Sequence, residues 1–92
     1  MNQAILFSDN EQYQAQQQQV RFQAQCQGAL ITCCIDVAHL YQLNEQTPPP
    51  ESTEATVMAL FENARFDIED LAESMIQQQS FDQDGHIHLS FS

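Results

Sequence analysis

Basic residues are almost missing from this chain of 92 residues. It contains no lysine, and only Arg21 and Arg65 stand against 13 aspartates and glutamates, so that the formal net charge is −11. The phosphates of nucleic acids and of anionic lipids repel such a surface, and we therefore expect no direct binding to nucleic acid or to membrane. A basic protein or a cation is compatible with this charge as a partner, although acidity also serves simply to keep a small protein soluble.

Glycine and long apolar runs are equally scarce. With only Gly28 and Gly85, a phosphate-cradling glycine loop is not expected, and no serine-nucleophile motif occurs either. No segment approaches the ~18 apolar residues of a membrane span, and the opening "MNQAILFSDNE" has neither the basic start nor the apolar length of a signal peptide. These absences predict a cytoplasmic protein that is not an enzyme and uses no cofactor.

What the chain does contain is a strong hairpin pattern. Apolar residues, which make up 42% of the chain as in a globular protein, alternate with polar ones in "VRFQAQC", and "ALITCCIDV" follows after Gln27 and Gly28. Glycine supplies the positive φ that a two-residue turn needs. This turn predicts a register that keeps one face apolar. The pairs on that face are Cys26 with Ala29, Ala24 with Ile31, Phe22 with Cys33, and Val20 with Ile35.

The cysteines do not form a disulfide framework in this interpretation. Cys26, Cys33 and Cys34 are an odd number, which argues for reduced thiols in a cytosolic chain. Neighbouring residues of a strand point to opposite faces, so Cys26 and Cys33 are expected in the core. Cys34 is expected on the other face, opposite Arg21, whose charge would lower the thiol pKa. The sequence places no histidine beside Cys34, which leaves a nucleophilic thiol as a remote alternative.

Shorter elements flank this hairpin. An apolar run at residues 3–7 predicts a first strand. The spacing of Ser8 and Glu11 matches a capping box and predicts a short helix at residues 9–14. A further short helix is predicted at residues 37–44, before the proline-rich loop "EQTPPPES", because a residue that precedes proline is pushed out of the helical region.

Two longer helices and a final strand complete the predicted fold. "TEATVMALFENA" (residues 53–64) and "DIEDLAESMIQQQ" (residues 67–79, capped by Asp67) have helical apolar spacing. "HIHLSF" alternates as a strand, and its core-facing residues are Ile87, Leu89 and Phe91. The order predicts an α+β fold: one small, mainly antiparallel sheet of about four strands with the two longer helices packed on one face. The length fits a single domain, residues 1–92.

Four short signatures carry a resemblance to a known family: "ILFSDNE", "LITCCI", "LFENARFDIEDLAESMI" and "DQDGHIHLSF". In these signatures and in the order of its elements, nearly the whole chain resembles the small bacterial proteins of domain-of-unknown-function family 1488. The resemblance implies a compact α+β fold. It implies no activity, since the family has no established one, and it assigns no role to any residue.

The stretch "SFDQDGHIHLSF" invites a calcium-loop interpretation. Asp82, Asp84 and Gly85 fit the middle of such a loop. The bidentate acid that the loop needs at its end is replaced by Phe91, and no helix can follow it within the chain. Aspartate and glycine are also ordinary turn residues, so we interpret this segment as a turn before the last strand.

A second metal interpretation uses the histidines of the same stretch. His86 and His88 share one face of the predicted strand, and with Asp82 and Asp84 they form a candidate divalent-metal site. His39 is the only other histidine and belongs to a different element. Because two histidines do not complete a zinc site, we favour the alternative that both line the solvent side of the last strand.

The acidic helices offer a candidate interaction surface, made of Glu62, Glu69, Asp70 and Glu73. Such a surface could dock a basic protein by charge complementarity, although a plain solvated helix face has the same composition. The sequence therefore predicts a small acidic soluble bacterial protein, a monomer or weak homodimer, that acts as a non-catalytic protein-interaction or regulatory accessory module. The alternative is a divalent-metal-binding protein that uses the segment from Asp82 to His88.

Overall fold

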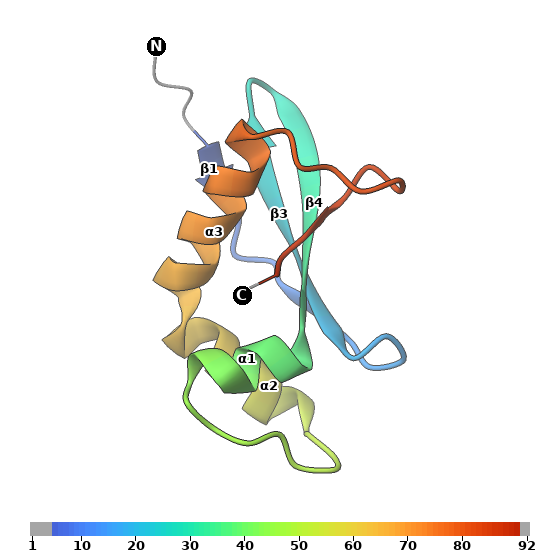
Figure 1. Cartoon of the computed structure of the whole chain (residues 1–92), viewed down its shortest axis with the longest axis vertical. Helices are drawn as coiled ribbons and strands as arrows, with labels where there is room; N and C mark the ends of the chain where they lie inside the picture. The colour runs from blue at the N-terminus through green and yellow to red at the C-terminus, as the bar shows by residue number, and fades with distance from the viewer. Residues whose placement is uncertain (1–4, 91–92) are drawn as a thin grey trace.

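Helices cover one face of a five-stranded sheet, as Figure 1 shows for residues 5–90, the part of the chain that this computed structural model describes. This arrangement confirms the predicted α+β class, with one strand more than the four expected. The elements in chain order are β1 (Ile5–Phe7), β2 (Gln12–Gln14), β3 (Gln19–Cys26), β4 (Ala29–Asp36), α1 (Val37–Leu43), α2 (Glu54–Asn63), α3 (Arg65–Gln77) and β5 (Ile87–His88).

The long hairpin of β3 and β4 forms in the predicted register. Cys26 pairs with Ala29, and the ladder continues through the pair of Phe22 and Cys33 and beyond. The turn residues Gln27 and Gly28 have φ values of 53° and 82°, as a two-residue turn with two left-handed positions requires. Alternation then sends one set of side chains into the core and the other set to the opposite face. The core set is Val20, Phe22, Ala24, Cys33 and Ile35.

The short helix predicted at residues 9–14 is wrong, because residues 12–14 form β2. Tyr13 pairs with Val20 of β3 and packs against the core. The capping box does not form: the Ser8 hydroxyl donates to Asn10 Oδ1 at 2.6 Å, and the Glu11 carboxylate pairs with Arg65, 54 residues away. Strand pairing and a distant ion pair thus outweigh a local helix signal. β1 and β2 follow one another along the same edge of β3.

The helices bury the apolar stripes that their sequences predict. α2 starts after Thr53, whose hydroxyl accepts the Thr56 N–H at 3.2 Å, and α3 buries Ile68, Ala72 and Ile76. α3 begins at Arg65 and not behind an Asp67 cap, because α2 passes into α3 through the single residue Ala64. No helix among the described residues is long and apolar enough to cross a membrane.

The last strand is short and lies parallel to β4. Ile87 pairs with Cys33 and His88 with Cys34, which completes the strand order β1-β3-β4-β5. Two parallel neighbours need a crossover, and the three helices between β4 and β5 supply it. Ile87 and Leu89 are buried as predicted, whereas Phe91 lies outside the described residues.

Candidate metal site

A row of polar side chains crosses the face of the sheet that the helices leave uncovered. The three ladders align Gln12 of β2, Arg21 of β3, Cys34 of β4 and His88 of β5. Since residues in register share a face, this row brings a thiol, a guanidinium and an imidazole together from segments far apart in the sequence. Parallel pairing of β5 with β4 therefore creates the candidate site.

Cys34 is almost completely enclosed although it lies on the face without helices. Its exposed fraction is 2%, and its backbone carbonyl accepts the Leu89 N–H at 2.8 Å, which fixes the end of β5 beside it. The Cys34 Sγ and one ring nitrogen each of His86 and His88 lie within 4.8 Å of one another. The sequence alone places no histidine beside Cys34, whereas the parallel pairing of β5 with β4 brings two of them there.

The predicted turn places the carboxylates of Asp82 and Asp84 next to the histidines. Asp84 Oδ1 accepts the His86 N–H at 2.9 Å, the Gly85 N–H donates to the Asp82 carbonyl at 2.9 Å, and Gly85 has the positive φ of 80° that such a turn requires. Asp84 Oδ2 then lies 2.8 Å from His88 Nε2. Asp82, Asp84 and His88 form a second cluster of ligand atoms within 4.8 Å of one another, and it shares His88 with the first.

Hydrogen bonding stabilises the ionised form of the Asp84 carboxyl group. The bond from His88, together with the His86 N–H, holds the pKa of the Asp84 carboxyl below its usual value. A carboxylate that stays ionised and faces two imidazoles can accept a proton from them or share a cation with them. The favoured picture of two histidines that merely line the solvent side is thus incomplete: both rings are partly buried and both face acids.

The two neighbouring thiols are both harder to ionise than an ordinary cysteine. Burial raises the pKa of Cys34, and the charge of Arg21 opposes this rise without reversing it. Burial, with a smaller effect of Cys34, raises the pKa of Cys33 to about 12. Arg21, which the register correctly places opposite, lowers the pKa of Cys34 as expected, but desolvation is the larger effect and the net shift is upward.

Two buried nitrogen atoms near this row lack a hydrogen-bond partner within residues 5–90. They are Arg21 Nε and His86 Nδ1, the latter lying 3.4 Å from Asp84 Oδ2 without forming a hydrogen bond to it. Buried polar atoms are normally satisfied, so an unsatisfied imidazole nitrogen that faces a carboxylate is a position at which a cation would gain a ligand.

The four acids of the predicted interaction surface differ in their exposure and in their ion pairs. Arg65 Nε donates to Glu62 Oε2 at 2.9 Å, and Arg65 Nη1 donates to Glu69 Oε2 at 3.3 Å. The bond with Arg65 lowers the pKa of Glu62. Asp70 is exposed and Glu73 is half-buried. Arg65 therefore pairs with two of the four acids without neutralising both, and Asp70 and Glu73 lie further along α3.

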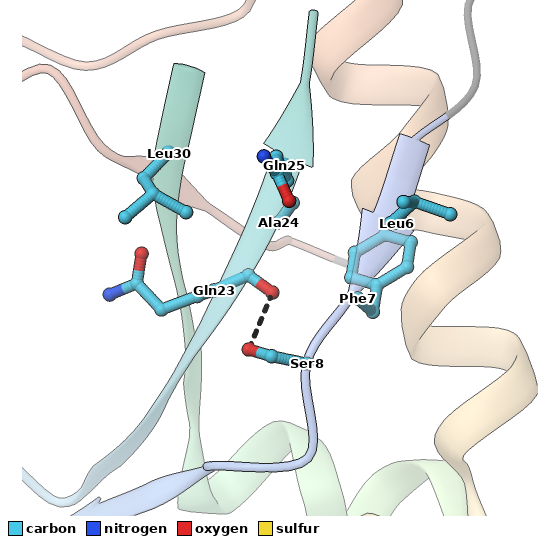
Figure 2. A pocket seen from close by; sticks show the side chains of 7 residues that line it. All are labelled: Leu6, Phe7, Ser8, Gln23, Ala24, Gln25 and Leu30. Carbon is cyan, nitrogen blue, oxygen red and sulfur yellow. Dashed lines mark hydrogen bonds between the residues drawn. The ribbon is translucent and has the colours of Figure 1, made fainter. Parts of the chain in front are cut away.

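A shallow pocket occupies the uncovered face at the end of the sheet away from the histidines. Figure 2 shows Leu6 of β1 and Leu30 of β4 on either side of the glutamines of β3, with the Ser8 hydroxyl bonded to the Gln23 carbonyl at 3.5 Å. None of the seven residues that line this pocket is ionisable. It offers apolar and amide contacts but no charged group that could pair with a charged ligand.

Comparison with known proteins agrees with the resemblance seen in the sequence. The family described as "Protein of unknown function (DUF1488)" matches residues 5–89. The chain belongs to this family. It is 37% identical over 90 residues to the uncharacterized protein YrdB of Escherichia coli (strain K12) and 36% identical to YrdB of Shigella flexneri. In both cases the match covers 97% of this chain and 99% of the relative.

A solved structure extends the DUF1488 assignment to three dimensions. The crystal structure of a DUF1488-family protein of unknown function from Shewanella loihica PV-4 has 37% sequence identity to this chain and a TM-score of 0.87. The match covers 97% of this chain and 94% of that one. The fold implied by the four sequence signatures is therefore that of the DUF1488 family.

Proposed function

We propose that this DUF1488 protein is not an enzyme and that it binds a divalent transition-metal ion at the junction of β4 and β5. The supporting observation is that Asp82, Asp84 and His88 each place a ligand atom within 4.8 Å of the other two, and that His86 Nδ1 lies 3.4 Å from Asp84 Oδ2. Imidazole nitrogen favours zinc, nickel or copper, whereas a calcium loop would need the terminal acid that this segment lacks.

The spacing of the donor atoms supports a single ion. In a four-coordinate site with bonds of 2.0–2.1 Å, neighbouring ligand atoms lie about 3.3 Å apart. Asp84 Oδ2 lies 2.8 Å from His88 Nε2 and 3.4 Å from His86 Nδ1, and Asp82 Oδ2 lies 3.9 Å from His88 Nε2.

Calorimetric titration with zinc, nickel and calcium tests this proposal. We expect zinc and nickel to bind with one ion per chain and calcium to give little heat. The substitutions His88→Ala and Asp84→Ala should each weaken binding by at least about tenfold, since even outer-shell groups contribute that much. His39→Ala is the matched control, because His39 lies on α1. Equal affinity for wild type and the His88→Ala variant, or no binding of either transition metal, would contradict the proposal.

A second candidate role is the docking of a basic protein partner, as an accessory module, on the acidic side of α2 and α3. The net charge of −11 and the exposed carboxylates of Glu62 and Asp70 support it. Such binding would weaken on raising the salt concentration, so capture of partners at low and high salt distinguishes it from uncharged contact. A cytoplasmic location belongs to both candidates and is supported by the Cys33 and Cys34 thiols, which form no disulfide.

A further inference from the structure

The most enclosed donor near the proposed metal site is a sulfur atom. Cys34 lies on the sheet itself, and the two imidazoles reach it from β5 and the preceding turn, so that all three candidate atoms fall within 4.8 Å of one another. Cys34 is paired with Arg21 on one side and with His88 on the other, and its side chain is enclosed, with an exposed fraction of 2%. Donors held on paired strands are more precisely placed than donors on loops.

We propose that Cys34 is the inner ligand of the metal site, that the site therefore selects thiophilic ions of the zinc class, and that Arg21 competes with the ion for the sulfur. This inference rests on the proposed metal-binding function. It specifies the class of ion that binds and identifies Arg21 as a residue that lowers the affinity for it. Cys34, His86 and His88 supply three ligands, and Asp84 or water supplies the fourth, as in the three-protein-ligand sites that keep one open position.

The chemistry of the sulfur sets the selectivity. A zinc ion binds thiolate at about 2.3 Å and imidazole at about 2.0 Å, which places sulfur and nitrogen about 3.5 Å apart in a tetrahedral site, within the 4.8 Å that the three atoms span. As the metal–sulfur bond forms, the thiol proton leaves to solvent, and no electron is transferred. Magnesium and calcium prefer oxygen ligands and gain nothing from this sulfur.

Arg21 gives the site a built-in competitor. It lies directly across from Cys34 in the ladder, and its buried Nε has no hydrogen-bond partner within the described residues. Its positive charge interacts with the thiol in the metal-free protein. A bound cation would meet the guanidinium at short range, so the ion must displace the arginine or bind against its repulsion. Removing this charge should strengthen metal binding.

Cobalt(II) serves as a spectroscopic substitute for zinc in the test. We expect the wild-type protein to show the near-ultraviolet charge-transfer band of a cobalt–thiolate bond, and excess zinc to remove it. Cys34→Ser should abolish this band and lower zinc affinity by at least about tenfold while weaker binding by the histidines and acids persists. Cys26→Ser, at the far end of β3, is the matched control and should keep the band. Arg21→Met should raise zinc affinity.

A second measurement needs no variant and holds even where Cys34→Ser fails to fold. In the wild-type protein, zinc should slow maleimide labelling of Cys34, located by mass spectrometry, and calcium should not. A cobalt band that survives Cys34→Ser, unchanged zinc affinity in that folded variant, or labelling of Cys34 that zinc does not slow would overturn this inference while leaving the proposed function intact. If neither cobalt nor zinc binds the wild-type protein, both fail together.

Discussion

Cys33 and Cys34 are neighbours in β4, and they show how differently the two faces of the sheet are built. Cys33 is fully buried under the helices, between Phe22 and Ile87, which are its partners in the ladder. Cys34 is buried to nearly the same extent, but Arg21 and His88 are its ladder partners. The first thiol is enclosed by apolar packing, and the second lies between two polar, ionisable side chains.

The two kinds of enclosure have different energetic consequences. Apolar packing excludes water from Cys33 and leaves nothing to stabilise a thiolate, which is why its pKa rises to about 12. At Cys34 the guanidinium of Arg21 partly offsets the same desolvation. A buried ionisable group among polar partners is a candidate for a functional role, although structural ion pairs share this feature. Of the two thiols, Cys34 on the uncovered face is therefore the candidate.

The two arginines of the chain allow the largest test of this comparison. Arg65 on α3 pairs with Glu11, whose side chain is only 6% exposed, and also bonds Glu62 and Glu69. Arg65→Met leaves the buried Glu11 carboxylate without its partner, and we expect a loss of about 3–5 kcal/mol in the free energy of unfolding. Denaturant unfolding measures this loss.

Arg21→Met on the uncovered face is the matched control. Arg21 has a buried nitrogen without a partner within residues 5–90, so its removal should cost less than about 1 kcal/mol. Equal losses from the two substitutions would mean that the uncovered face contributes to stability as much as the helical side does. Both variants keep a long apolar side chain, which limits the effect of lost packing.

The Arg65 cluster also shows what the sequence could and could not predict. The register of the hairpin is predicted to the residue, because alternation and a two-residue turn are local signals that support each other. Glu11 was assigned to a helix cap because its spacing from Ser8 is local, whereas its true partner is 54 residues away. No local pattern predicts an ion pair at such a distance.

The same limit applies to the candidate site. Alternation in the last strand correctly placed His86 and His88 on one face, and turn chemistry correctly described the segment from Asp82 to Gly85. Cys34 was missed because its approach to the histidines depends on which strand pairs with β5. Pairing partners are chosen by the packing of the whole sheet, and a two-residue strand carries almost no signal for them.

The alkaline limb of the stability curve tests the apolar enclosure of Cys33. An unfolded thiol loses its proton near pH 8.5, whereas the folded one keeps it until about pH 12. The folded state then binds more protons than the unfolded state, so the free energy of unfolding falls as pH rises above about 8.5. The slope is about 1.4 kcal/mol per pH unit, or roughly 2–3 kcal/mol by pH 10.5.

Cys33→Ala provides the comparison for this effect. The variant is less stable at every pH because of the cavity it creates, but it should lose the Cys33 contribution to the alkaline slope. All other residues are the same in the two proteins, so the difference between their slopes reports the effect of Cys33. Parallel stability curves for the two proteins between pH 8 and 10.5 would show that Cys33 is solvated and that the contrast between the faces is weaker than we infer.

The smallest change in the free energy of unfolding is expected for a substitution at the end of the uncovered face away from the histidines. Leu30 is 73% exposed beside the shallow pocket of Figure 2, so Leu30→Thr should change the free energy of unfolding by less than about 0.5 kcal/mol. Ile35→Ala on the same strand, facing the helices, should cost about 2–5 kcal/mol. Unfolding at two protein concentrations completes the test. If Leu30→Thr lowers the free energy of unfolding by more than about 1 kcal/mol, and this loss grows with protein concentration, a second copy of the chain covers this face in solution. The two faces of the sheet would then both be covered, one by helices and the other by a second molecule.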